Sequence, residues 1–259
     1  MSGRFDHDPM FAGSIRKPEP PGFRILKSLG CMVLIVLVLQ CFLFLLSDLF
    51  RGGGREAARR AQCVNNLKQI ALAMHNYVSD HGALPPACTV DPSGRRLHSW
   101  RTLLLPYLEQ KALFDSIDLS RPWDDPVNAK ALAAIPYVYR CPSSTAPRNA
   151  TTYLANAAEG GCLIPGKHRR FAEISDPTGA TILDIEVDDG HAVPWMAPID
   201  ADESLILGLS AGSKPNHIWG FNAGMVDGSV KFLKVTLPAT VRRALISIAG
   251  GDGPKAEEF

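Results

Sequence analysis

The pair of residues best suited to acid–base or metal chemistry is His217 and Asp227, which nine residues separate. A histidine titrates near pH 6.5 and can transfer protons at neutral pH. However, Asp227 and Gly228 stand between two strand-like runs, and Asp-Gly is a strong signal for a hairpin with a type I′ turn. We therefore predict that Asp227 and Gly228 form a turn, that His217 hydrogen-bonds across this hairpin, and that neither is catalytic.

Cysteine thiols are the second set of candidates. No pair has the C-x-x-C spacing of zinc or thioredoxin-type sites, so we predict neither a metal site nor a redox pair. In an oxidising compartment the four cysteines outside the apolar N-terminal run could form up to two disulfides, in any of three pairings. Buried, unpaired thiols are the alternative. These cysteines are Cys63, Cys88, Cys141 and Cys162.

Carboxylates and aromatic rings supply two further possibilities. Two acidic stretches could bind calcium through several oxygens, although solvated loops explain them as well and no EF-hand pattern occurs. Four tryptophans could line a ligand-binding face, although packing is their commoner role. We expect no cofactor, with calcium left open. The residues are Glu186, Asp188, Asp189, Asp200, Asp202 and Glu203, and Trp100, Trp123, Trp195 and Trp219.

Other enzyme and nucleic-acid classes lack their signatures. His75 and His191 have no H-x-x-x-H companion, no G-x-S-x-G elbow occurs, and Gly52–Gly54 has no lysine in the P-loop position. The net charge is +1, and no lysine- and arginine-rich stripe appears. The sequence predicts a protein without catalytic activity that does not bind nucleic acid.

An apolar segment lies near the N-terminus. No charged residue occurs from Ser28 to Ser47. A helix of this length spans roughly 27 to 33 Å, about the thickness of the hydrocarbon layer of a bilayer. We predict one transmembrane helix over residues 28–50, retained without cleavage. Arginine and lysine flank both ends, so the charge bias only slightly favours a cytoplasmic N-terminus.

The rest of the chain divides around this span. Residues 1–27 are expected to form a disordered tail, Gly52–Gly54 to break the helix within a joint at 51–54, residues 55–252 to form the folded domain, and 253–259 a second disordered tail. In the domain, apolar residues recur at alternating spacings of four and three, which predicts an amphipathic helix up to about Gly82. These residues are Cys63, Leu67, Ile70, Met74 and Tyr77, with Asn66, Gln69, Asn76 and Asp80 opposite.

Short helices and strands are expected to follow. Helical patterns cover 103–108, 109–117, 128–134 and 238–249, and strand-like runs cover 151–156, 180–187, 221–226 and 229–235. The amphipathic helix must bury its apolar stripe against something, and the strands supply a sheet for it. The sequence therefore predicts an α+β domain in which this helix packs on an antiparallel sheet.

Several segments carry a family resemblance. REAARRAQCVNNLKQIALAMHNY at 55–77 and the His217, nine residues, Asp227-Gly228 motif are similar to the bacterial domain of unknown function 1559 family, whose members resemble type II secretion pseudopilins at their N-termini. Further matching segments are LPPA at 84–87, LLPYLEQ at 104–110, PWDDPVN at 122–128, YRCPSS at 139–144, FAEISDPTGATILDIE at 171–186, VPWMAP at 193–198 and ALISIAGGD at 244–252.

The resemblance implies a pilin-like fold and a place in the cell envelope, without an established activity. The chain departs from a prepilin leader: Gly22-Phe23 is its one candidate cleavage point, and Lys27 stands where a pilin has glutamate. We expect an unprocessed, single-pass protein of the inner membrane, with its main domain outside the cytoplasm. Its expected partners are the membrane and other envelope or secretion-apparatus proteins, and a tethered module that binds carbohydrate or peptide is the alternative.

Overall fold

The computed structural model describes residues 21–210, 212–251 and 253, and it omits the side chains of 21–28, 31 and 45–53. The chain forms two compact units, Met1–Gly53 and Gly54–Phe259. Of the two tails expected over 1–27 and 253–259, residues 1–20 and 254–259 lie outside the described residues. Each unit is taken in turn below.

The described part of the first unit is helical. Helix α1 is assigned from Pro21 to His81. Two expectations were therefore wrong, because residues 21–27 are helical rather than a tail and the helix does not break at Gly52–Gly54. Glycine costs a helix about 1 kcal/mol relative to alanine, but it can adopt helical φ and ψ, so it disfavours a helix without forbidding one.

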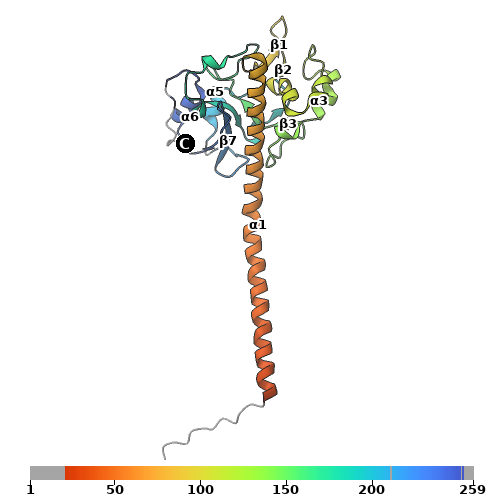
Figure 1. The fold of residues 1–259 in the computed structure, drawn as a ribbon, viewed down its shortest axis with the longest axis vertical. Helices are drawn as coiled ribbons and strands as arrows, with labels where there is room; N and C mark the ends of the chain where they lie inside the picture. The colour runs from red at the N-terminus through yellow and green to blue at the C-terminus, as the bar shows by residue number, and fades with distance from the viewer. Residues whose placement is uncertain (1–20, 211, 252, 254–259) are drawn as a thin grey trace, which may run out of the picture. The chain divides into compact units, whose positions relative to one another are not determined.

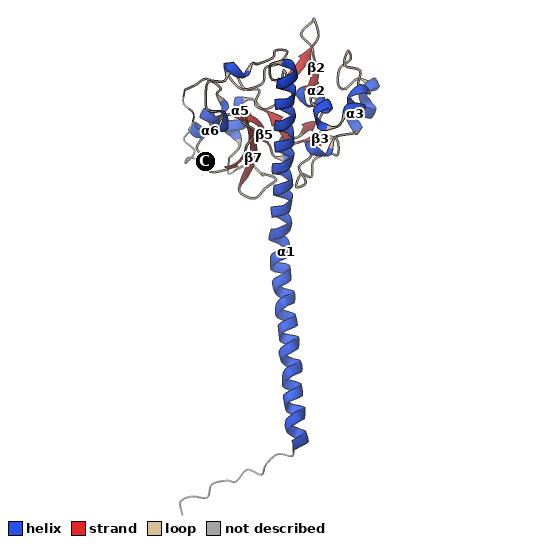
Figure 2. Cartoon of the chain, viewed as in Figure 1, coloured by secondary structure: helices blue, strands red, loops and turns tan. Residues whose placement is uncertain are grey.

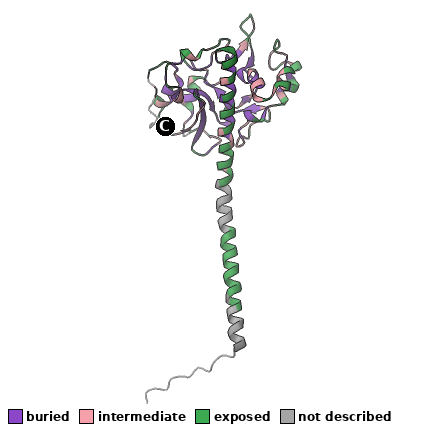
Figure 3. Cartoon of the chain, viewed as in Figure 1, coloured by how far each residue is buried: buried purple, intermediate pink, exposed green. Residues whose placement is uncertain are grey.

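The predicted membrane span falls partly outside the described side chains. Among the side chains that the structure describes, no helix is both long and apolar enough to cross a membrane. The predicted span includes Ser28, Cys31 and residues 45–50, whose side chains are not part of that set. The described side chains between Leu29 and Phe44 are all exposed (Figure 3).

The second unit is built around antiparallel sheets (Figures 1 and 2). The main sheet has four strands in the order β4-β5-β7-β8, and all of its neighbouring strands are antiparallel. There are two smaller antiparallel pairs: β1-β2 precedes the main sheet in sequence, whereas in the pair β3-β6 strand β3 precedes β4 and strand β6 lies between β5 and β7. The α+β class is confirmed. The strands are Cys88–Val90 (β1), Arg96–Ser99 (β2), Ala150–Thr151 (β3), Tyr153–Ala155 (β4), Ile182–Glu186 (β5), Val193–Pro194 (β6), Gly220–Met225 (β7) and Val230–Lys234 (β8).

Short helices fill the connections, and all of them except α5 lie close to the positions that the sequence predicts. Five 3₁₀ turns besides the one at Asp189–His191 join them. The α-helices after α1 are Trp100–Leu103 (α2), Lys111–Asp115 (α3), Ala129–Ala133 (α4), Glu203–Gly208 (α5) and Ala239–Ile246 (α6). The 3₁₀ turns are Leu105–Leu108, Pro126–Asn128, Tyr137–Tyr139, Phe171–Glu173, Thr178–Ala180 and Asp189–His191.

The C-terminal part of α1 packs into the larger of two cores. Its predicted apolar stripe, from Cys63 to Tyr77, is buried together with Tyr153 and Ala155 of β4. The amphipathic pattern is confirmed with one correction, because Asn66 is buried rather than opposite the stripe. Its amide donates to the Arg140 carbonyl at 2.9 Å, which satisfies the buried polar group.

The second core lies against the other face of the main sheet. Side chains of β7 alternate, so that Phe221, Ala223 and Met225 join this core while Asn222 points to the α1 side. Ile206 of α5 and Leu245 of α6 cover these strand residues. The main sheet is thus buried on both faces along β5 and β7, and the polar residues of these two strands on its α1 side are enclosed.

The β7–β8 hairpin is present, but its turn differs from the predicted type. Gly228 has a φ of 84°, whereas Asp227 does not have a positive φ. The Gly228 N–H donates to the Met225 carbonyl and the Met225 N–H to the Ser229 carbonyl. This is a three-residue loop ending in a left-handed glycine, in which only one residue needs positive φ, so aspartate is accommodated without strain.

Candidate functional site

Four buried side chains meet on the α1 side of the main sheet, and we call them the Cys/His/Glu cluster: Cys63, Cys141, Glu186 and His217. Their ligand-type atoms all lie within 4.8 Å of one another. Cys141 Sγ is 3.5 Å from His217 Nε2, which is 3.4 Å from Glu186 Oε1. Each side chain is at most 1% exposed.

Four separate parts of the chain supply these residues. Cys63 lies on the buried stripe of α1, and Cys141 follows the 3₁₀ turn Tyr137–Tyr139. Glu186 ends β5, where it pairs with Tyr153 of β4. His217 precedes β7 in a tight turn closed by a bridge to Gly220.

The turn at His217 has an unusual backbone. Its third residue, Trp219, has a φ of 75°, which is uncommon for a bulky residue. Ile218 and Trp219 are 64% and 75% exposed, whereas His217 is buried. Strained backbone of this kind concentrates at functional positions, and here it directs His217 inward.

A carboxylate orients the histidine from outside the cluster. His217 Nδ1 lies 2.8 Å from Glu56 Oε1, so Nε2 is left facing the two cysteines and Glu186. Arg59 donates to the other oxygen of Glu56 at 2.8 Å and to Ser143 Oγ at 3.1 Å. The histidine ring is therefore fixed in one orientation.

Polar neighbours support the other members. The Tyr153 hydroxyl lies 3.0 Å from Cys63 Sγ, and the Asn66 amide donates to that hydroxyl at 3.4 Å. The Asn222 amide donates to Glu186 Oε2 at 2.9 Å. A neutral polar group therefore lies beside Cys63 and another beside Glu186.

The ionisation of the cluster is strongly perturbed. Hydrogen bonds from Cys63 and His217 lower the pKa of Cys141, despite its burial. Burial opposes protonation of His217, but Cys141 and the Glu186 charge raise its pKa to about 9. Burial and the Cys141 charge raise the pKa of Glu186 to about 8, and burial raises that of Cys63. The favoured state is a Cys141 thiolate beside a His217 imidazolium.

Such a set of groups has three chemical uses. A thiolate–imidazolium pair can act as a nucleophile, but that requires access for a substrate, and all four side chains are buried. Two neighbouring thiols can form a disulfide. Two thiolates, an imidazole and a carboxylate also form a ligand set for a transition metal.

His217 and the Asp227-Gly228 pair, which form one motif in the sequence, lie apart in the structure. His217 enters the cluster and does not hydrogen-bond across the hairpin as predicted. Asp227 lies beyond the far end of β7, where its carboxylate accepts from the Ser229 N–H at 2.8 Å and its own N–H donates to the Thr178 carbonyl. Asp227 and Gly228 are turn residues, and His217 is the motif residue with chemical partners.

The cysteines follow the alternative of buried, unpaired thiols. All four are free in the structure. Cys63 and Cys141 come together, whereas Cys162 donates to the Ile182 carbonyl at 3.0 Å and Cys88 lies in β1. Burial raises the pKa of Cys162 to about 12, so this thiol stays protonated.

The acidic residues considered for calcium do not converge. Glu186 is in the cluster, Asp200 pairs with buried Arg101 at 2.9 Å, and Asp202 caps α5. Among the described residues, the Cys/His/Glu cluster is the one group of three or more metal-ligand side chains. Glu186 lies in β5, as the strand predicted over 180–187 implies, and not in a solvated loop as its grouping with the other acidic residues suggested.

The tryptophans do not form one face. Trp100 and Trp195 are fully buried and donate to Asp200 and to the Leu132 carbonyl. Trp123 packs partly buried against the same core, and Trp219 is exposed. Packing explains three of the four.

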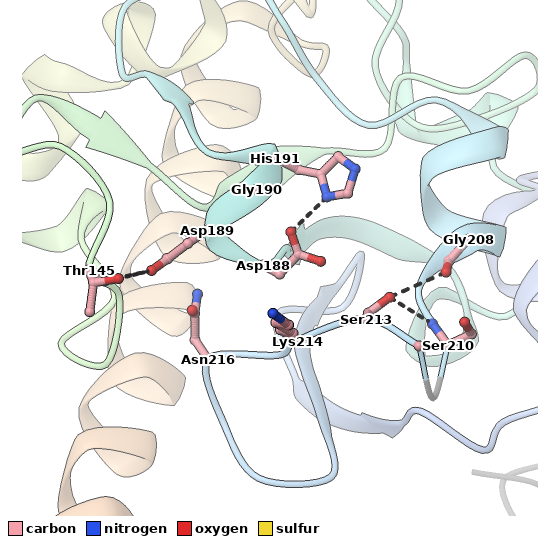
Figure 4. A pocket seen from close by; sticks show the side chains of 11 residues that line it. Thr145, Asp188, Asp189, Gly190, His191, Gly208, Ser210, Ser213, Lys214 and Asn216 are labelled. Atoms are coloured by element: carbon pink, nitrogen blue, oxygen red, sulfur yellow. Dashed lines mark hydrogen bonds and ion pairs between the residues drawn. The ribbon is translucent and has the colours of Figure 1, made fainter.

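An open pocket of about 620 Å³ lies beside the segment that leads to His217 (Figure 4). Polar residues dominate its lining, and several are already paired. Asp188 contacts His191 at 2.7 Å, and Asp189 accepts from the Thr145 hydroxyl at 2.6 Å. Asn216, the residue before His217, also lines this pocket.

Comparison with known proteins bears on two of the cluster residues. Residues 53–181 match the family model described as "Protein of unknown function (DUF1559)". This match supports the resemblance that the sequence indicated, and it includes Cys63 and Cys141. Glu186 and His217 lie in segments that resemble DUF1559 but follow the matched range. No curated protein and no solved structure matches the chain.

Proposed function

We propose that this chain is a membrane-anchored, pseudopilin-like envelope protein of the DUF1559 type that acts through surface contacts and does not catalyse a reaction. One observation carries the proposal. Within the single helix α1, an uncharged and exposed stretch at 29–44 precedes an amphipathic stretch whose stripe is buried in the folded domain.

The exposed stretch supports the membrane anchor. Its large apolar side chains are each more than half exposed, on every side of the helix. Apolar surface of this extent marks a region that contacts lipid or protein. A bilayer would cover these apolar side chains. A helix can lie in lipid because its backbone polar groups are satisfied by hydrogen bonds within the helix.

The folded domain supports the comparison with pilins. An N-terminal helix lies against one face of a four-stranded antiparallel sheet, as the pseudopilin resemblance implies. The absence of catalysis rests on the burial of the cluster, whose nucleophilic thiols a substrate could not reach. Lys27 in the place of the pilin glutamate favours an anchor that is kept rather than processed.

The test is membrane retention of the full chain. The unaltered chain should sediment with membranes and need detergent for release. A variant with both Leu34→Asp and Leu37→Asp should move to the aqueous fraction, because each central aspartate costs insertion about 2.5 to 3.5 kcal/mol. Leu72→Asp is the matched control, since Leu72 is an exposed leucine of α1 outside this stretch and its replacement should leave retention unchanged.

Two results would count against the proposal. Recovery of the unaltered chain in the aqueous fraction without detergent would show that it is not anchored in the membrane. A mature chain beginning at Phe23 in intact-mass analysis would show processing by a prepilin peptidase.

A second candidate function is binding of a small polar ligand outside the cytoplasm, favoured by the pocket at Asp188 and Asn216. Its volume is within the range of small-molecule sites, although its lining is more polar than usual. A ligand screen by thermal shift separates the two functions, because a ligand that prefers the folded state raises Tm.

A further inference from the structure

We propose that Cys63, Cys141, Glu186 and His217 form a structural zinc site that fastens α1 to the main sheet. This inference is independent of the membrane proposal, since it concerns side chains of the second unit alone. It rests on geometry, on an unpaired buried oxygen, and on the groups that surround the four ligands.

Two distances between ligand atoms match the edges of a tetrahedron around one ion, and all four ligand atoms lie within 4.8 Å of one another. Zinc binds sulfur at about 2.3 Å and nitrogen or oxygen at about 2.0 to 2.2 Å, so its tetrahedral ligand atoms lie roughly 3.4 to 3.8 Å apart. The sulfur–nitrogen distance between Cys141 and His217 is 3.5 Å, and the nitrogen–oxygen distance between His217 and Glu186 is 3.4 Å. Both agree with the edges of such a tetrahedron.

One oxygen in the cluster has no hydrogen-bond partner. Glu186 Oε1 is completely buried and accepts no hydrogen bond from any described residue, although it lies 3.4 Å from His217 Nε2. A buried carboxylate oxygen without a partner costs free energy. A cation between this oxygen, the imidazole and the two sulfurs satisfies it.

The surrounding groups match those around structural metal sites. A metal-binding histidine usually donates a hydrogen bond from its other ring N–H to a carboxylate, a backbone carbonyl or a water, and this bond fixes the ring. Glu56 Oε1 accepts in this way from His217 Nδ1 at 2.8 Å. Two thiolates and a carboxylate around Zn²⁺ leave one net negative charge, and the Tyr153 hydroxyl and Asn222 amide stand beside it as donors.

The ligand set selects zinc and a structural role. Thiolate and imidazole ligands in tetrahedral geometry favour zinc over magnesium or calcium, which prefer six or more oxygens. Four protein ligands leave no open position for substrate, as in closed structural sites. The site would join α1, the loop after Tyr139, β5 and the turn before β7, which are far apart in sequence.

The direct test is the metal content of the full chain, purified in detergent without added metal. We expect one zinc ion per chain. After removal by a chelator, added Co²⁺ should give the intense absorption of thiolate-to-cobalt charge transfer and the pattern of tetrahedral cobalt. Cobalt that binds without the thiolate absorption would overturn the proposal.

Variants assign the ligands. Cys141→Ser should abolish the thiolate-to-cobalt signal or reduce its intensity, and Glu56→Gln should weaken zinc binding roughly 10- to 100-fold while keeping the signal, because Glu56 only orients His217. Cys88→Ser is the matched control: Cys88 is equally buried but lies outside the cluster, so its loss should change nothing. Equal loss of metal in Cys88→Ser would contradict the assignment.

A readout that needs no variant separates zinc from a disulfide. In the denatured, unaltered chain, alkylation followed by mass analysis counts the free thiols. Zinc-bound Cys63 and Cys141 become free to alkylate once a chelator is added, without a reductant. If they react only after reduction, they form a disulfide and the zinc proposal is wrong.

Discussion

Arg101 is a buried arginine whose guanidinium makes five hydrogen-bond contacts. Its guanidinium is fully buried and donates to the carbonyls of Trp195 and Ala197 at 2.8 and 2.9 Å. It also contacts Asp200 Oδ1 at 2.9 Å, and that oxygen accepts from Trp100 Nε1 as well. The VPWMAP segment at 193–198 therefore bends around one arginine.

Replacing Arg101 by methionine should destabilise the fold strongly. Asp200 would remain buried without its cation, which typically costs about 3 to 5 kcal/mol. Urea unfolding followed by tryptophan fluorescence would measure the loss. Arg243→Met is the control, because its ion pair with Glu203 is exposed and should cost no more than about 1 kcal/mol. Similar effects of the two replacements would contradict the role given to Arg101.

His98 should make stability depend on pH. It is buried, and burial lowers its pKa although Nε2 contacts the Arg121 carbonyl at 2.7 Å. In the unfolded chain His98 binds a proton near pH 6.5, whereas in the folded chain it binds one only at lower pH. The free energy of unfolding therefore falls as the pH drops below about 6.5.

Substituting His98 by glutamine should reduce that fall between pH 7 and pH 5, because glutamine can still donate to Arg121 but does not titrate. Unfolding curves at the two pH values supply the measurement. His191→Gln is a suitable control, since its ring is half exposed. An unchanged pH slope in His98→Gln would show that another group controls acid sensitivity.

At the scale of elements, the close approach of β7 and β8 at Gly220 depends on the absence of a side chain at this position. A Cβ at this position would overlap the Leu233 carbonyl oxygen and the Phe232 ring. Gly220→Ala should therefore lower the free energy of unfolding by about 1 to 3 kcal/mol. Gly208→Ala in α5, where nothing lies within 4 Å of the added carbon, should stay within about 1 kcal/mol. Equal stability of the two variants would show that the strands adjust.

Sequence periodicity predicted the elements better than it predicted the site. The stripe from Cys63 to Tyr77 could be recognised because one face of a helix repeats within a short window. The Cys/His/Glu cluster could not, because its four members come from α1, the loop after Tyr139, β5 and the turn before β7, and they meet only in the folded domain. No local spacing records such an arrangement. Glu56 was missed for the same reason, since it precedes His217 by 161 positions in the sequence.

Helix continuity was the main error of the element predictions. Three consecutive glycines gave a strong local argument for a break, yet α1 includes them. The argument summed intrinsic preferences of about 1 kcal/mol each and gave no weight to the helical segments predicted on both sides of the glycines. The boundary between the two compact units nevertheless falls between Gly53 and Gly54.

At the scale of the whole molecule, the proposed topology can be tested directly. If the domain at 54–259 lies outside the cytoplasm, added protease should digest it in spheroplasts but not in intact cells that retain an outer barrier. A cytoplasmic protein should survive in both samples. Digestion that begins only after the spheroplasts are lysed would place the domain in the cytoplasm and exclude envelope partners outside it.

The exposed indole of Trp219 lies two residues from His217, within one tight turn. Trp100 and Trp195 are fully buried and Trp123 is partly buried, so an aqueous quencher such as iodide acts mainly on the Trp219 emission. A paramagnetic ion bound at His217 would also quench the fluorescence of this indole, because the two residues are close together. The fluorescence of Trp219 should therefore report metal binding at the cluster without an added label.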